Sequence, residues 1–134
     1  GRSRLMSLRR IKSGGAFEAK IGYCRAVVAG DWIHVAGTVA APLPGTAEPP
    51  EGAAAQCVSA LEIIKAALNE AGAEFSDVVR VTYMLPVAAE FEACWPILRD
   101  TFGEAPPAAT MIECGLIDPK YRIEIEVTAY KPRP

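Results

Sequence analysis

The longest regular pattern of apolar and polar residues runs from Glu51 to Ala71. Apolar side chains recur there every three or four residues, at Cys57, Leu61, Ile64 and Leu68. The polar positions between them are Gln56, Ser59, Glu62, Lys65 and Asn69. This spacing places each set on its own side of a helix. The pattern therefore predicts an amphipathic helix whose polar set faces solvent, with Gly72 as its C-terminal cap.

A different period marks the last third of the chain. Between Arg122 and Tyr130, the apolar residues Ile123, Ile125 and Val127 alternate with Glu124, Glu126 and Thr128. Alternation with a period of two is typical of a strand with one apolar and one polar face. We therefore expect Glu124 to point away from the apolar core.

Five further runs predict strands: Leu8–Lys12, Cys24–Ala29, Trp32–Ala36, Val78–Leu85 and Ala109–Cys114. Gly30 and Asp31 separate the second run from the third, which is typical of a tight hairpin. Ser13, Gly14 and Gly15 form a break where the chain can reverse. Four prolines between Pro42 and Pro50 predict a surface loop, because proline fixes φ and lacks an N–H donor.

A second helix is predicted from Val87 to Phe102, with a kink at Pro96. The expected order is then β-β-β-α-β-α-β-β, in one α+β domain with two helices packed on one face of a mixed β-sheet. Such a sheet leaves its other face without a covering layer. We therefore expect self-association through that face.

Composition and charge exclude several classes of protein. The chain has 134 residues and a formal net charge of −2, which gives no electrostatic reason to expect a nucleic acid partner. Its basic cluster, Arg2, Arg4, Arg9, Arg10 and Lys12, is interpreted as a solvated strand, with an arm that contacts phosphate as the alternative. Residues 1–7 are expected to be disordered or vector-derived, with a single domain over 8–134 and Met6 as a candidate native start.

The cysteines and the hydropathy indicate a soluble cytoplasmic protein. Cys24, Cys57, Cys94 and Cys114 form no Cys-x-x-Cys pair, and His34 is the one histidine, so no metal site is expected. No run reaches the length of about 18 apolar residues that a membrane span requires. We expect no membrane association, and free thiols in a reducing compartment.

Several segments together resemble the Rid (YjgF) family, which includes reactive-intermediate deaminases. They are Gly30–Gly37, the helix from Gln56 to Gly72, Phe75–Thr82, Pro107–Glu113 and Arg122–Ala129. Their order and spacing carry the resemblance over about residues 10–131. The resemblance implies a chorismate-mutase-like subunit, a homotrimer with small-molecule clefts between subunits, and hydrolysis of imines or enamines to carbonyl compounds and ammonia without a cofactor.

One position departs from the deaminase pattern. In the family, an arginine in a Pro-Ala-Arg-Ser/Thr motif binds the substrate carboxylate, whereas this chain has Pro107-Ala108-Ala109-Thr110. Alanine offers no charge-assisted hydrogen bond, so activity on 2-imino acids is not expected. Arg25 and Arg122 are candidate replacements, although solvation at the surface is the preferred interpretation of both.

The remaining candidates come from the resemblance, residue by residue. Glu124 matches a glutamate that activates water, and Gly37 matches a glycine whose carbonyl faces the substrate nitrogen. Cys24, preceded by Tyr23, falls where a pocket tyrosine is usual. Trp95 replaces an asparagine, and Met111 replaces a cysteine. Thr110 keeps the last position of the arginine motif. Together with Ala109, these residues form the predicted site.

Physical chemistry leaves alternatives beside these roles. A solvated glutamate is the alternative for Glu124, while a cleft near Glu113 or Glu126 would raise its pKa by repulsion and desolvation. His34 is interpreted as a packed or interface histidine, and Cys24 and Cys114 as structural thiols. The predicted function is hydrolysis of an imine or enamine. The alternatives are a non-catalytic binder or sensor of a small molecule and, with less support, a ribonuclease or translation inhibitor, since relatives carry those labels.

Overall fold

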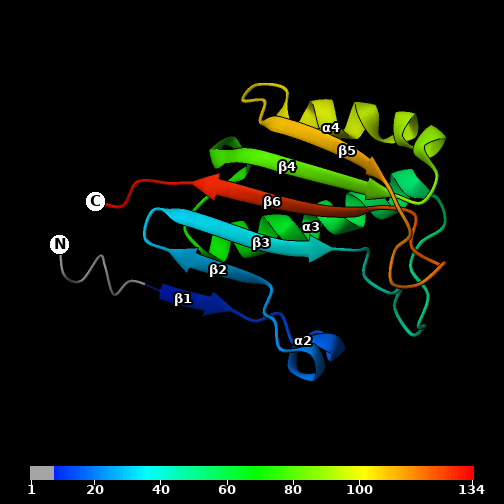
Figure 1. The fold of residues 1–134 in the computed structure, drawn as a ribbon, viewed down its shortest axis with the longest axis horizontal. Coiled ribbons are helices and arrows are strands. Elements are labelled where there is room, and N and C mark those ends of the chain that lie inside the picture. Colours follow the sequence, from blue (N-terminus) through cyan, green and yellow to red (C-terminus); the bar gives the residue numbers. More distant parts are fainter. Residues whose placement is uncertain (1–7) are drawn as a thin grey trace.

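A computed structural model describes residues 8–134, in which six strands form one mixed sheet (Figure 1). The predicted disordered or vector-derived segment 1–7 lies outside the described residues. In spatial order the strands are β1 (Leu8–Ile11), β2 (Ala26–Ala29), β3 (Trp32–Thr38), β6 (Glu124–Tyr130), β4 (Val78–Leu85) and β5 (Ala108–Glu113). The pair β4–β5 is parallel and the other pairs are antiparallel. The predicted mixed sheet is confirmed.

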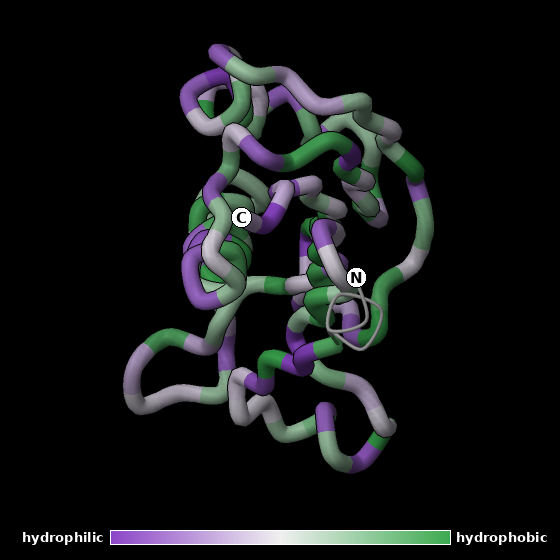
Figure 2. Tube along the Cα trace, turned by 90° about the vertical axis from the view of Figure 1, so that its left-hand side faces the viewer, coloured by the Kyte–Doolittle hydropathy of each residue, from purple (hydrophilic) through white to green (hydrophobic). Residues whose placement is uncertain are grey.

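Two helices, α3 (Ala53–Glu70) and α4 (Trp95–Phe102), lie on one side of this sheet (Figure 1). The apolar positions predicted for the long helix are buried, and they pack with the core-facing residues of the strands. Seen along the strands (Figure 2), the coil of α3 is banded in green and purple, as its amphipathic sequence requires. Within residues 8–134, no helix combines the length and the hydropathy needed to cross a bilayer.

The structure contains a short α-helix that the sequence pattern did not predict. A short helix, α2 (Ala16–Ile21), follows the predicted break at Ser13–Gly15. Its apolar residues Phe17 and Ile21 are exposed, so it has no buried stripe that a periodicity analysis could detect. Glu18 fixes its start, because the carboxylate accepts hydrogen bonds from the backbone N–H groups of Ser13 and Gly15, each at 3.2 Å.

The second predicted helix is wrong in one respect. Residues 87–102 do not form one kinked helix: a 3-10 helix, η2 (Ala88–Cys94), precedes α4. Pro96 lies in the first turn of α4, where its missing N–H removes no intrahelical hydrogen bond. A further short 3-10 helix, η1 (Phe75–Asp77), leads into β4.

Candidate functional site

The Glu124 side chain lies on the sheet face that the helices leave uncovered. Ile123 and Ile125 on either side of it are fully buried, and Glu124 itself is half-buried. Burial raises the pKa of this carboxyl, the nearby charge of Glu126 raises it further, and the positive charge of Arg25 lowers it. The direction agrees with the prediction from the sequence. Within residues 8–134, Glu124 accepts no hydrogen bond, so its oxygens can bind water or a ligand.

Gly37 makes this position of the carboxylate possible. A Cβ built on Gly37 would lie 2.1 Å from Oε2 of Glu124, closer than any real contact. The register of β3 against β6 shifts between Val35 and Thr38, which sets Gly37 beside Glu124. A side chain at residue 37 would therefore force the Glu124 carboxylate to move, and the two predicted residues do meet.

Arg25 corrects the interpretation made from the sequence. Its side chain is only 8% exposed rather than solvated. Its Nη1 donates to the carbonyl of Gly37 at 3.0 Å and to Oγ1 of Thr38 at 2.7 Å. The guanidinium thus lies beside the glycine that contacts Glu124, and it is the cation whose charge acts on that carboxylate.

Tyr23 and Cys24 lead into Arg25 and border the same region. The Tyr23 ring centroid is 5.6 Å from Cζ of Arg25, and its hydroxyl accepts a long hydrogen bond of 3.4 Å from Nη2. The Cys24 thiol donates to the carbonyl of Ala26 at 3.3 Å. Both residues line a hollow of about 720 Å³ on the uncovered face of the sheet. The lining of this hollow does not include Glu124, so the place of both residues at the site and their roles stay predictions.

The hollow carries polar side chains from strands across the sheet. Its lining includes the cations Arg10, Lys12 and Arg80, together with Glu126 and His34. His34 is exposed here, so it is not packed within the subunit, and an interface role stays a prediction. Thr110 also belongs to this face, because β5 places it beside Thr82, and its hydroxyl accepts a hydrogen bond from Arg80.

Three predicted site residues lie on the other side of the sheet. Ala109 is in register with Val81 and Met111 with Tyr83, two residues whose side chains enter the helical core. Residues in register share a face, so Ala109 and Met111 point to the helical side. Trp95, at the start of α4, lines a separate hollow of about 330 Å³ together with Tyr83. A single subunit therefore does not bring these residues to Glu124.

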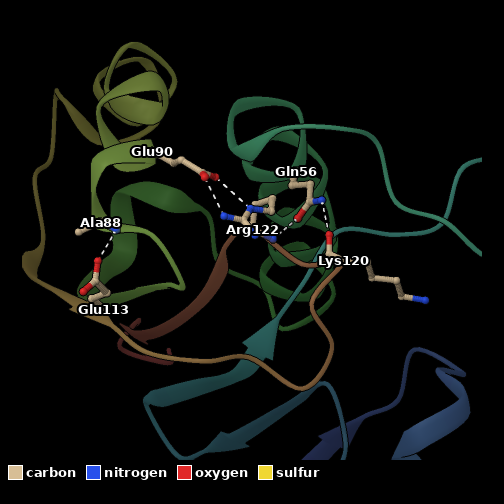
Figure 3. Close-up of polar contacts among 6 residues, drawn as sticks. All are labelled: Gln56, Ala88, Glu90, Glu113, Lys120 and Arg122. Atoms are coloured by element: carbon tan, nitrogen blue, oxygen red, sulfur yellow. Dashed lines mark hydrogen bonds and ion pairs between the residues drawn. The ribbon is translucent and has the colours of Figure 1, made fainter.

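A polar network ties the start of β6 to α3 and η2 (Figure 3). Gln56 is 1% exposed: its Nε2 donates to the carbonyls of Pro50 and Lys120, each at 3.0 Å, and its Oε1 accepts from the N–H of Arg122 at 2.7 Å. The position of Gln56 on the solvent side of the helix was wrongly predicted. This amide fixes the segment that leads into Glu124.

The side chain of Arg122 points away from the site and pairs with η2. Its Nε and Nη2 donate to the two carboxylate oxygens of Glu90 at 3.0 and 2.7 Å (Figure 3). This partner lowers the pKa of the Glu90 carboxyl. Arg122 is only partly exposed, so the expectation of plain solvation is wrong for it too. Its guanidinium is engaged by Glu90, so its candidate role as an anion-binding arginine gains no support within one subunit.

Comparison with known proteins gives the family. Residues 14–131 match the family model described as Endoribonuclease L-PSP. A crystal structure from Mycobacterium tuberculosis, titled as a member of the YjgF/YER057c/UK114 family, superposes with a TM-score of 0.84 and 34% identity over 92% of this chain and 99% of that one. The chain belongs to the YjgF family. The predicted chorismate-mutase-like α+β fold is thereby confirmed.

Other YjgF family members extend the comparison. A RutC family protein of Pyrococcus abyssi is 37% identical over 111 residues, which cover 81% of this chain and 86% of the relative. A 2-iminobutanoate/2-iminopropanoate deaminase of Capra hircus is 28% identical over 123 residues, which cover 91% and 90%. Relatives of the YjgF family thus include a named deaminase.

The sequence analysis missed residues that shape this YjgF site. Arg25 was considered only as a candidate replacement for the motif arginine, and Thr38 was not considered. Each stands in an apolar run without a motif, and their contact depends on the register between β2 and β3. A charged residue inside the run Cys24–Ala29 was the available signal. Among residues 8–134, no group of three metal-ligating side chains comes together.

Proposed function

We propose that this protein is a homotrimeric hydrolase that converts an uncharged imine or enamine to a carbonyl compound and ammonia without a cofactor. The observation that carries the proposal is the Glu124 carboxyl, half-buried against Gly37, with its pKa raised. A raised pKa makes the protonated form of this carboxyl easier to reach than in a solvated glutamate, which suits a group that donates and then takes back a proton. The named deaminase among the relatives supports the same class of reaction.

The chemistry uses one water molecule and one carboxyl group. Protonated Glu124 donates a proton to the imine nitrogen while the water oxygen attacks the carbon, and the C=N electron pair moves to nitrogen. The carboxylate that results takes a proton from the attached water. Glu124 then protonates the amino nitrogen of the carbinolamine, and the C–N bond breaks with its electron pair leaving on ammonia. The carboxylate takes the hydroxyl proton, so that this oxygen becomes the carbonyl. The balance is imine plus water to carbonyl compound plus ammonia.

The arrangement of the sheet supports an assembly with shared sites. Glu124 and Gly37 lie on the uncovered face, whereas Ala109, Met111 and Trp95 lie on the helical side near the β5 edge. One cleft can contain both groups only if a second copy supplies one of them. Exposed Trp32 and Tyr130, with ring centroids 4.8 Å apart, add apolar area to the uncovered face.

The charges favour a substrate without a carboxylate. Ala109 offers no cation, and the Arg25 guanidinium already binds Gly37 and Thr38. The positive charge of Arg25 acts on Glu124, so the charge balance beside this carboxylate leaves neither Arg25 nor residue 109 as a free cation for an anion. Adding a guanidinium at residue 109 would change that balance.

The test uses two imines that differ in charge. A flavin amine oxidase acting on benzylamine releases an uncharged aldimine, and a serine dehydratase releases a 2-imino acid. Semicarbazide traps the imine that remains, and ammonia is measured by a coupled assay. We expect the protein to accelerate loss of the aldimine and to have little effect on the 2-imino acid.

Three variants sharpen this experiment. Glu124→Gln should lower the aldimine rate at least tenfold, because proton transfer by a positioned group contributes about 10²–10⁴-fold. Glu62→Gln makes the same chemical change on the exposed side of α3 and should retain the rate. Ala109→Arg should raise activity on the 2-imino acid. Failure of the wild-type protein on both imines would refute the hydrolase.

A non-catalytic binder is the second candidate. It predicts that a small ligand raises the melting temperature and is recovered unchanged. Sedimentation decides the assembly: a subunit that stays single at assay concentration would remove the shared cleft on which both functions depend. Degradation of RNA that survives Glu124→Gln and further purification would favour a ribonuclease instead.

A further inference from the structure

Arg25 is a charged residue that lies almost fully buried. Its side chain is 8% exposed, and its Nε is buried without a hydrogen-bond partner among the described residues. Moving a guanidinium from water into a protein interior costs roughly several kcal/mol unless nearby groups compensate for the lost hydration. Here compensation comes from the Gly37 carbonyl, the Thr38 hydroxyl and the face of the Tyr23 ring.

Two carboxylates lie within the field of this cation, and they differ in how they are satisfied. Glu18 of α2 accepts hydrogen bonds from Ser13 and Gly15, so its negative charge is held by its own segment. Glu124 accepts none within residues 8–134, and the neighbouring Glu126 repels it. The positive charge of Arg25 therefore contributes more to stabilising the ionised form of Glu124 than that of Glu18.

The geometry links Arg25 to Glu124 through Gly37. Nη1 of Arg25 binds the carbonyl of Gly37, while Oε2 of Glu124 packs where a Cβ of Gly37 would be. The same Nη1 binds Oγ1 of Thr38, whose hydroxyl donates to the carbonyl of Ala36 at 2.7 Å. These bonds fix residues 36–38 at the point where β3 departs from regular register with β6.

We propose that Arg25 is a positioning residue for Glu124: its guanidinium fixes the Gly37 backbone against the carboxylate and supplies the balancing positive charge. The catalytic role of Arg25 rests on the proposed function. The effect of Arg25 on the position and charge of Glu124 rests only on the contacts described above. The charged groups that act on the carboxylate are Arg25, before β2, and Glu126, on β6. β4 contributes uncharged Met84 beside it.

The proposal also changes the meaning of the Gly37 carbonyl. The family resemblance assigns this oxygen to the substrate nitrogen, yet here it already accepts a hydrogen bond from a cation. A carbonyl oxygen has a second lone pair, so a neutral N–H donor can still bind. A protonated, cationic nitrogen would be repelled by Arg25. The imine should therefore bind neutral and receive its proton from Glu124.

The test measures the ionisation of Glu124 directly in the full-length protein. Glutamate labelled with ¹³C at the side-chain carboxyl is titrated by NMR, and the Glu124 signal is identified by its loss in Glu124→Gln. In Arg25→Gln we expect the midpoint to rise by about one pH unit, because an opposite charge nearby favours the ionised form. Arg25→Lys keeps a charge and should restore most of the wild-type midpoint.

Activity provides a second readout with a distinct pattern. The alkaline limb of the rate–pH profile, where the protonated Glu124 that the mechanism requires is lost, should move with the NMR midpoint in Arg25→Gln and return in Arg25→Lys. A merely structural arginine would instead lower the rate equally at every pH. If the protein lacks imine hydrolysis but the midpoint moves, the proposed function fails and the positioning role stands. A midpoint that stays in place in folded Arg25→Gln overturns the role.

A milder variant covers the case in which Arg25→Gln does not fold. Thr38→Val removes the hydroxyl that binds Nη1 and keeps the shape of a fully buried side chain. It should raise the Glu124 midpoint in the same direction by a smaller amount. Glu126→Gln should lower the midpoint, since it removes the repelling charge. A midpoint unmoved by Thr38→Val, or raised by Glu126→Gln, contradicts the assignment of charges.

Discussion

Replacing Gln56 by methionine tests the network that fixes the start of β6. Methionine has nearly the same length and shape but forms none of the three hydrogen bonds that the amide makes with Pro50, Lys120 and Arg122. The side chain is 1% exposed, so water cannot replace those partners without opening the core. The change therefore isolates the polar interactions from packing volume.

The expected loss follows from the number of bonds. Each net contribution is about 0.5–1.5 kcal/mol, so three bonds together stabilise the fold by about 1.5–4.5 kcal/mol. At an unfolding entropy of roughly 2.1 cal/mol/K per residue, each kcal/mol is worth about 3.5 °C for a chain of this length. Gln56→Met should lower the melting temperature by about 5–16 °C.

Urea unfolding followed by circular dichroism gives the same quantity as a free energy. Wild type and variant are compared at one subunit concentration, because assembly makes apparent stability depend on concentration. Glu62→Met, on the exposed side of the same helix, is the matched control and should stay within about 0.5 kcal/mol of wild type. A Gln56→Met protein as stable as this control would refute the reasoning.

Three further predictions concern the site and its surroundings. Gly37→Ala should displace the Glu124 carboxylate, because the new Cβ would lie 2.1 Å from Oε2 of Glu124. The variant should lose hydrolysis and show a lower NMR midpoint for Glu124, with little loss in melting temperature because a flexible side chain can move away. Glu124→Gln should be more stable than wild type at pH 7 but not at pH 4. The folded-state pKa of Glu124 is raised, so the wild-type protein loses stability as the pH rises through it, and the variant does not. Unfolding measured at both pH values checks this. Glu90→Gln should lose a little stability at neutral pH and none well below the lowered pKa of Glu90, since protonation there already breaks the pair with Arg122; equal losses at both pH values would contradict this.

Much of the fold follows from local pattern. The strand Val78–Leu85 begins and ends where predicted, and the alternation around Glu124 correctly places its neighbours in the core. The hairpin at Gly30 forms as expected, with φ at +60°. These elements are half-buried and regular, so their period in the sequence reports their faces directly.

The features that the sequence pattern did not predict depend on contacts between segments that are far apart in the chain. Gln56 has the spacing of a solvent-facing residue, yet the loop at Pro50 and the segment at Lys120 cover it and require its amide. Arg25 is buried because the irregular end of β3 brings carbonyl and hydroxyl acceptors to it. Neither event leaves a periodic signal.

The candidate site divides in the same way. The sequence identified Glu124 and Gly37 through resemblance, and the structure brings them into contact. The sequence could not predict that Ala109 lies on the opposite face, because that depends on the register of β5 against β4. The place of Trp95 depends on where α4 begins and packs.

The outer edge of β5 has a consequence for handling the protein. This strand ends the sheet, so one row of its backbone N–H and C=O groups has no ladder partner. Its sequence, AATMIE, carries exposed Met111 and Ile112, with no proline or lysine inside the strand to discourage pairing with another chain. Under the proposed assembly, dilution or mutation that separates the subunits should therefore yield protein that precipitates on standing, and light scattering after dilution would record it.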